Sequence, residues 1–322
     1  MDLRHKEISI SDIDLGDTSF QFSLHPYADA SLIQSIDELG ILYPVFVRKK
    51  GNTYQLLNGF KLLHAADFLH IPILPAAILP EDTSDINCIK IVLATQPTTP
   101  SPVTIANIIY RLKQLSSSEE EFYTLVSEIL HIQNRQQIND YLLLATLSPH
   151  LRPFVEEGVL SLSILPLFTQ KIDAETQLPL AHLFQKYRYS FQKQREIITH
   201  LYEISRVQSL SVAQFLQSPE FTELTKNETD KGASAGAIRN YIRKKRYPEL
   251  AQAEIQFMEN LKKLRLSEKI QLSPPEGFEG NTFKIQFTFT HPEELVEIIQ
   301  NLTEMKQNPI FPSIVKKFEP TK

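Results

Sequence analysis

The sequence predicts a multidomain α+β protein with an α/β N-terminal domain, an all-α middle domain and a small α+β C-terminal domain. The first hundred residues mix strand-like alternation with helical spacing, and the next hundred show helical spacing only. Two stretches poor in large apolar residues, "ATQPTTPSPVT" and "SPEFTELTKNETDKGASAGA", interrupt these patterns. We therefore expect domains at 1–96, 97–216 and 238–322, with a flexible linker at 217–237.

Bulk properties exclude several classes of protein. The net charge of -5 over 322 residues excludes a uniformly basic, histone-like protein, so any contact with nucleic acid needs a local basic patch. One cysteine, Cys88, excludes a disulfide framework and a Cys-rich zinc site. The N-terminus lacks a signal pattern, and the longest apolar window, "IPILPAAIL", is too short to span a bilayer. We expect a cytoplasmic protein with no membrane partner.

The N-terminal domain is predicted element by element. "SLIQSIDELG" has helical spacing and ends on Gly40, which suits a helix C-terminus. "YPVFVRKKGNTYQLL" alternates like two strands around a Lys-Gly-Asn turn. A helix at 60–69 and a proline-containing strand at 71–79 follow.

The middle and C-terminal domains are predicted in the same way. "TIANIIYRLKQL", "SSSEEEFYTLVSEIL" and "NRQQINDYLLLATL" predict helices, the second with a serine cap and acids in its first turn. Helices joined by a few residues are typical of a small bundle. In the tail, "PELAQAEIQFMENLKKL" and "PEELVEIIQNL" predict helices, and "KIQLS" and "FKIQFTF" predict strands.

The two helices predicted at 119–130 and 134–144 are joined by three residues, the spacing of a helix-turn-helix whose second helix enters the major groove. The packed side would comprise Phe122, Val126, Ile129, Ile138 and Leu142. The DNA-reading side would comprise Asn134, Arg135, Gln136, Gln137 and Asn139, whose amide and guanidinium groups can pair with bases. The alternative is an ordinary αα-corner, because Asp140 would repel phosphate and the turn has no glycine.

A second candidate DNA contact is the basic run "IRNYIRKKRYPEL". It carries Arg239, Arg243, Lys244, Lys245 and Arg246 and no acid before Glu249. Such a run fits phosphate contacts that position a protein without reading sequence. The alternative is a solvated helix start beside a linker.

Gly59 begins a helix after a strand, as glycines in phosphate-binding turns do. Backbone N–H groups at the helix start, with Lys61 and His64, would face an anion. The alternative is that Asn58-Gly59 only forms a turn. No catalytic or metal-binding motif stands out, and Cys88 in "INCIKIVL" is predicted to be a buried core thiol.

Taken in order, these segments resemble the ParB family of partition proteins. "SLIQSIDELGILYPVFVRKKGNTYQLLNGFKLLHAADFLHIPILPAAIL" resembles the ParB N-terminal domain. The matching frame is Gly40, Pro44, Val47, Arg48, Gly59, Ala65 and Ala66. "NRQQINDYLLLATLSPHLRPFVEEGVLSLS" resembles the family's recognition helix and the segment that follows it. The matching residues there are Glu156, Glu157, Gly158, Leu160 and Ser161.

The resemblance implies a nucleotide-responsive N-terminal domain, but the nucleotide motifs depart from the family pattern. The family's Gly-Glu-Arg-Arg stands as "GFKL" here, and its Glu-Asn-x-Gln-Arg stands as "LATQP", with Leu93 and Ala94 where the acid and amide belong. The residual candidate nucleotide or phosphate site is Arg48, Gly59, Lys61, His64 and Gln96. Loss of the charged side chains removes the contacts that hold a triphosphate with Mg²⁺, so we expect weak or absent CTP binding and no hydrolysis.

The resemblance also implies partners. We expect a sequence-specific protein that binds double-stranded DNA, forms a homodimer, resides on the nucleoid and acts with a ParA-type ATPase in plasmid or chromosome partition or related DNA organisation. One alternative is a nucleotide-binding or phosphate-transferring enzyme on the same fold. Another is a scaffold or transcriptional regulator that has lost nucleotide use.

Overall fold

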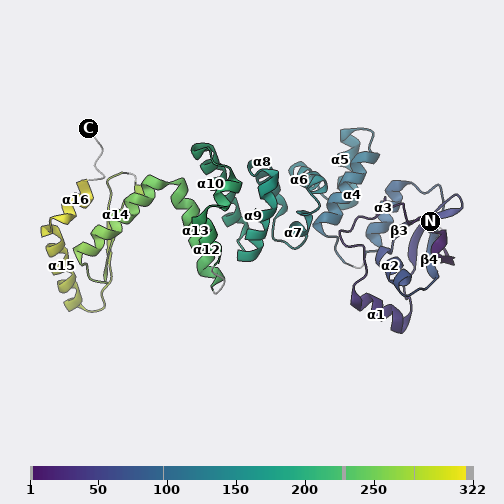
Figure 1. Cartoon of the computed structure of the whole chain (residues 1–322), viewed down its shortest axis with the longest axis horizontal. Helices are drawn as coiled ribbons and strands as arrows, with labels where there is room; N and C mark the ends of the chain where they lie inside the picture. Colours follow the sequence, from purple (N-terminus) through teal and green to yellow (C-terminus); the bar gives the residue numbers. More distant parts are fainter. Residues whose placement is uncertain (1–2, 97, 227–229, 279, 317–322) are drawn as a thin grey trace. The chain divides into compact units, whose positions relative to one another are not determined.

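The computed structural model describes residues 3–96, 98–226, 230–278 and 280–316. The chain divides into two compact units, which we call the N-terminal unit, Met1–Ile198, and the C-terminal unit, Thr199–Lys322. The protein is mostly helical with small sheets, as the sequence predicts (Figure 1). None of the helices in the described ranges combines the length and hydrophobicity that a membrane span needs.

The N-terminal unit opens with a four-stranded sheet of order β1-β4-β2-β3. Its elements are β1 (Arg4–Ser9), η1 (Ile10–Asp12), α1 (Ala30–Leu39), β2 (Val45–Lys50), β3 (Thr53–Asn58), α2 (Phe60–Phe68), β4 (Ile73–Leu79) and α3 (Asp85–Ala94). β2 and β3 form an antiparallel hairpin, β2 and β4 are parallel, and β1 is antiparallel to β4. β1 was not predicted, because "RHKEIS" is polar and buries only Ile8.

The sheet and α2 enclose an apolar core. Val45, Val47 and Leu56 point inward from the hairpin, and Ala66 meets them from α2. The small side chains of Ala65 and Ala66 are fully buried, which lets the helix lie close to the strands. This packing fixes the position of the β3–α2 turn.

The rest of the N-terminal unit is helical. Its elements are α4 (Pro102–Leu115), α5 (Glu119–Leu130), α6 (Arg135–Thr146), α7 (Arg152–Glu156), η2 (Leu162–Ile164), α8 (Leu165–Lys171), α9 (Ala174–Tyr187) and the first part of α10 (Phe191–Gln208). Polar caps begin several helices, since Ser101, Ser118 and Asp173 each accept a backbone N–H from the first turn. All helices predicted in this region are present.

The α/β and helical parts of this unit pack together. The Asn107 amide on α4 donates to the Phe22 carbonyl at 2.8 Å, and Arg111 pairs with Asp85 at 2.7 Å. The boundary expected at residue 96 is therefore a change of secondary structure inside one compact unit.

The C-terminal unit contains the remainder of α10, α11 (Val212–Leu216), α12 (Pro219–Lys226), α13 (Lys231–Arg246), α14 (Pro248–Leu264), β5 (Ile270–Ser273), η3 (Glu276–Phe278), β6 (Lys284–Phe287), α15 (Pro292–Gln307) and α16 (Ile310–Lys316). Residues 217–237, expected to be a linker, hold α12 and the start of α13; only 227–229 of that stretch lie outside the described residues. The expectation is wrong for the described part. Phe221 is buried and packs on Phe215 and Tyr241, which a polar composition does not reveal.

The tail forms the predicted strands and helices. β5 and β6 pair antiparallel, with Leu272 opposite Ile285. Phe257 from α14, Leu272 from β5 and Met305 from α15 share one apolar cluster. α16 was not predicted.

Candidate functional site

α5 and α6 follow each other in the chain across a short turn that contains no glycine. His131 takes the left-handed conformation (φ 57°, ψ 28°), and its N–H donates to the Ser127 carbonyl at 3.1 Å. Asn134 then caps α6, because its Oδ1 accepts the Gln137 N–H at 3.2 Å. A histidine can adopt a conformation that usually favours glycine at a modest cost. The missing glycine is therefore no obstacle to the tight turn.

The start of α6 presents a polar face to solvent. All five residues predicted to read DNA on this helix are exposed: Asn134, Arg135, Gln136, Gln137 and Asn139. The Arg135 guanidinium lies over the ring of Tyr123 from α5, 4.5 Å from its centroid. This cation–π contact limits the freedom of the Arg135 side chain while its polar edge stays accessible.

Asp140 does not expose its carboxyl group on this face. Its side chain is buried and accepts a hydrogen bond from the Gln136 Nε2 at 2.9 Å. At the next residue, burial raises the pKa of Tyr141, and a hydrogen bond with the Gln137 side chain opposes that shift. The side chain that was expected to repel phosphate is thus turned inward and hydrogen-bonded.

The packed side of the pair differs in part from the prediction. Phe122, Val126 and Ile138 are buried as predicted, whereas Ile129 and Leu142 are only half-buried. α6 packs chiefly against α4, and its inner row is completed by the buried Tyr141 and Leu144. The three helices α4, α5 and α6 therefore support the exposed face together.

Two arginines of the basic run on α13 are engaged inside the C-terminal unit. Arg243 forms an ion pair with Glu254 at 2.6 Å, and Arg246 pairs with Glu203 at 2.5 Å. The hydrogen bond that Arg246 Nε donates to Glu203 raises the pKa of Arg246. Neither acid adjoins the run in sequence, so the sequence could not reveal them.

The remaining cations of this run reach the surface. Arg239, Lys244 and Lys245 are exposed, and the Lys245 ammonium lies 5.3 Å from the centroid of the Tyr241 ring. Three of the five predicted phosphate contacts are thus exposed.

Gly59 is required by the turn itself. It begins α2 with φ 104° and ψ 19°, and a Cβ at this position would lie 2.7 Å from Val45 Cγ1. Its N–H donates to Asn58 Oδ1 at 2.7 Å. The Asn58 Nδ2 in turn donates to Thr95 Oγ1 at 2.7 Å, which brings the end of α3 beside the turn. The Gly59 N–H is therefore already occupied.

Arg48, the strongest cation of the candidate nucleotide site, is held by the fold. Its guanidinium donates to Gln55 Oε1 at 2.5 Å and to the Thr83 carbonyl at 2.6 Å. It also forms an ion pair with Asp85 at 2.8 Å. These contacts leave little donor capacity for a phosphate.

The other residues of the candidate site do not converge. Lys61 is exposed, and Gln96 follows Thr95 beside the Gly59 turn. His64 Nδ1 accepts the Ala28 N–H at 3.3 Å, and its ring meets the edge of Tyr27. Gly59 and Gln96 therefore lie in one region, whereas Arg48 and His64 form hydrogen bonds with other parts of the fold.

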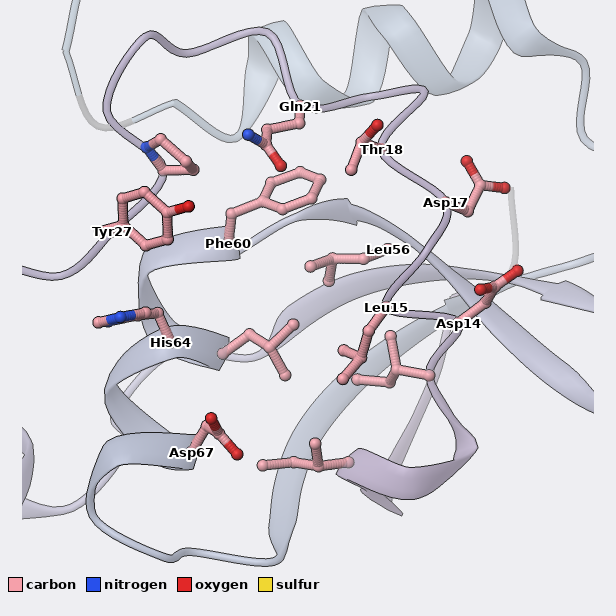
Figure 2. A pocket seen from close by; sticks show the side chains of 14 residues that line it. Asp14, Leu15, Asp17, Thr18, Gln21, Tyr27, Leu56, Phe60, His64 and Asp67 are labelled. Atoms are coloured by element: carbon pink, nitrogen blue, oxygen red, sulfur yellow. The ribbon is translucent and has the colours of Figure 1, made fainter.

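A cavity of about 190 Å³ lies beside α2 (Figure 2). Its lining includes apolar Leu56 and Phe60 and the carboxylates of Asp14, Asp17 and Asp67. Burial opposes ionisation of Asp17, yet hydrogen bonds from Ser19 and Lys50 lower its pKa to about 2, so it stays negative. The cavity is smaller than the roughly 300–1,000 Å³ of drug-sized ligand sites and its rim is acidic, so it does not suit a nucleoside triphosphate.

Cys88 is fully buried, and burial raises the pKa of its thiol. Within the described ranges, no three His, Cys, Asp or Glu side chains are grouped so that they could hold a metal ion.

Comparison with known proteins gives matches among solved structures only. No family model and no curated protein matches the chain. The chromosome-partitioning protein ParB from Caulobacter crescentus, C-terminally truncated and complexed with CTP-γ-S, is 17% identical, with a TM-score of 0.23 over 56% of this chain and 99% of the other. The same truncated protein complexed to the centromeric parS site is 14% identical, with a TM-score of 0.34 over 60% and 98%.

A Pnob8-like ParB-N domain is 11% identical, with a TM-score of 0.37 over 76% of this chain and 98% of the other. Similarity at this level does not establish a shared arrangement of the whole chain. The function has to be argued from the residues and contacts of this protein.

Proposed function

We propose that this chain is a ParB-like DNA-binding protein whose α6 helix reads bases in the major groove. The observation that carries the proposal is the exposed polar face at the start of α6, capped by Asn134 and supported by α4 and α5. Gln and Asn amides can pair bidentately with adenine, and Arg can pair with guanine. The inward orientation of Asp140 leaves that face free of an exposed carboxylate.

Selection of bound fragments from a random duplex library, followed by fluorescence anisotropy, tests this proposal. We expect one enriched sequence with at least a hundredfold preference over random duplex. The double variant Arg135→Ala/Gln137→Ala should lose most of that preference while keeping weak, sequence-independent binding. Equal affinity for all sequences, or a preference that survives the double variant, would refute base reading by α6.

The exposed cations of α13 would add phosphate contacts. Lys244 and Lys245 are accessible, whereas Arg243 and Arg246 are held by acids. Replacing Lys244 and Lys245 by Gln should lower the salt dependence of DNA binding without altering sequence preference. An unchanged salt dependence would exclude the run from the interface.

The N-terminal unit would bind CTP weakly or not at all and would not hydrolyse it, so the protein would act without enzymatic activity. The engaged Gly59 N–H, the engaged Arg48 guanidinium and the acidic cavity support this part of the proposal. Calorimetric titration with CTP and Mg²⁺ tests it, and saturable heat at micromolar nucleotide would contradict it.

The protein would form a homodimer through its tail. β6 pairs only with β5 in the described part of the chain, and its Ile285 and Phe287 are about 40% exposed although the residues opposite them are buried. An exposed edge strand with an apolar face is a template for pairing with a second copy. Light scattering should show a dimer that Ile285→Lys/Phe287→Lys converts to a monomer. A dimer would place two α6 helices on DNA, and it would act with a ParA-type ATPase in partition on the nucleoid.

A further inference from the structure

The corner between α9 and α10 is basic and has no acidic residues. The segment "QKYRYSFQKQR", residues 185–195, contains Lys186, Arg188, Lys193 and Arg195. The nearest acids along the chain are Glu175 and Glu196, so twenty consecutive residues carry no negative charge. Aromatic residues alternate with these cations, at Tyr187, Tyr189 and Phe191. In a protein of net charge -5, such a segment is a local exception.

The backbone of the corner is fixed by its aromatic residues. Tyr187 and Tyr189 are buried, with ring centroids 6.1 Å apart, and Tyr189 also meets the edge of Phe184. Between them Arg188 ends α9 in the left-handed conformation (φ 49°, ψ 48°). Because the rings of Tyr187 and Tyr189 are buried on either side of it, the backbone of Arg188 is fixed and its side chain is exposed to solvent.

Two cations of the corner have no partner in the part of the chain that the structure describes. Within the described ranges neither Arg188 nor Lys193 has an ion-pair or hydrogen-bond partner for its side chain, and both are exposed. This distinguishes them from Arg243 and Arg246, which acids already hold. Exposed unpaired cations are the groups that release counterions when a polyanion binds.

A hollow of about 430 Å³ lies against Arg188 and the start of α10. Arg188, Ser190 and Phe191 line it together with Gly158. The carboxylate in its lining, Glu157, accepts a hydrogen bond from Gln185 Nε2 at 2.9 Å. α10 starts at the same place, and the first N–H groups of an 18-residue helix add partial positive charge there.

We propose that this corner is a second nucleic-acid contact, which binds backbone phosphates of double-stranded DNA without reading bases. It rests on the DNA binding proposed for α6 but uses other residues of the same compact unit. Arg188 and Lys193 supply the charge, and the hollow beside Arg188 admits a phosphate between that side chain and the start of α10. Contacts of this kind position a protein on the duplex and carry no sequence information.

The test is the salt dependence of binding to a fluorescein-labelled 30-base-pair duplex of arbitrary sequence, for which no target site has to be known. For Arg188→Gln/Lys193→Gln, the slope of log affinity against log salt should fall by about 1.8, roughly 0.9 for each lost phosphate contact. Near 0.1 M salt this corresponds to an affinity loss of roughly tenfold per contact. The matched control is Lys49→Gln/Lys90→Gln, which removes two exposed cations from the α/β part of the same unit and should leave the slope unchanged.

The outcomes separate this inference from the proposed function. A lower slope in the corner variant alone supports the inference. Two outcomes overturn it when the unaltered protein binds in a salt-dependent way: both variants keep the slope of the unaltered protein, or the slope falls equally in both. Either outcome leaves α6 as the DNA-binding element. If the unaltered protein binds no duplex even at low salt, the proposed function fails and this inference fails with it. Circular dichroism of each variant confirms that the helices remain folded.

Discussion

Gly59→Ala should destabilise the N-terminal unit strongly, because this glycine serves the turn. The substitution forces an L side chain to φ 104° and places its Cβ 2.7 Å from Val45 Cγ1 and 3.3 Å from Val45 Cα. Val45 is fully buried in the sheet, so it cannot swing away. Something in the backbone or core has to move.

The magnitude follows from two separate costs. A side chain in a sparsely populated backbone conformation costs about 1–3 kcal/mol. Crowding a packed core costs about 1–3 kcal/mol more. The sum, roughly 2–6 kcal/mol, is a large fraction of the 5–15 kcal/mol that typically stabilises a domain.

Gly51→Ala is the matched control. Gly51 also has a positive φ, 59°, but a Cβ there would have nothing within 4 Å. Its cost should be only the left-handed backbone term, about 1–2 kcal/mol. Adding Val45→Ala should make Gly59→Ala less costly by a measurable coupling, because the closest clashing atom is removed.

Urea unfolding followed by far-UV circular dichroism measures these differences, since the chain has no tryptophan for fluorescence. Hydrogen exchange of peptides covering residues 45–68 assigns the effect to the turn. If Gly59→Ala and Gly51→Ala cost the same, or Val45→Ala leaves the cost of Gly59→Ala unchanged, the packing argument is wrong. Gly59 would then have to be explained by a ligand.

Three further changes test other contacts. Asn134→Ala removes the cap of α6 and should cost about 1 kcal/mol, with faster hydrogen exchange in the first turn of α6. Asp17 has its pKa lowered from 3.8 to about 2, so its contribution is present above pH 4 and is lost as pH falls toward 2. Asp17→Asn should therefore flatten that part of the stability profile in acid unfolding. Arg243→Gln should leave Glu254 unpaired and destabilise the C-terminal unit. Its effect on the salt dependence of DNA binding should be small, because Glu254 already holds Arg243. A lower salt slope without destabilisation would contradict this.

Local signals predicted the helices and strands whose ends are marked by caps or turns. The start of α6 at Asn134 and the N-terminal serine of α5 follow from capping chemistry, which depends on residues within one turn. The hairpin of β2 and β3 follows from alternation around Gly51. These features need no knowledge of distant partners.

Features that depend on distant residues could not be predicted. β1 is polar and is recruited by backbone pairing with β4, some seventy residues away. The region expected to be a linker is folded because Phe221 packs against Phe215 and Tyr241. In both cases tertiary contacts override a local composition that indicates little order.

The two basic segments show why charge in sequence does not identify a phosphate contact. The run on α13 is denser, but Glu203 and Glu254 from neighbouring helices neutralise two of its arginines. The corner between α9 and α10 has a lower density of cations. Within the described residues, however, the side-chain N–H groups of Arg188 and Lys193 have no partner and can contact DNA. Counterion release depends on charges that are unpaired before binding, because an arginine already held by a carboxylate must break that pair to contact DNA. The corner should therefore contribute more salt dependence per cation than Arg243 or Arg246, although the sequence alone indicates the opposite order.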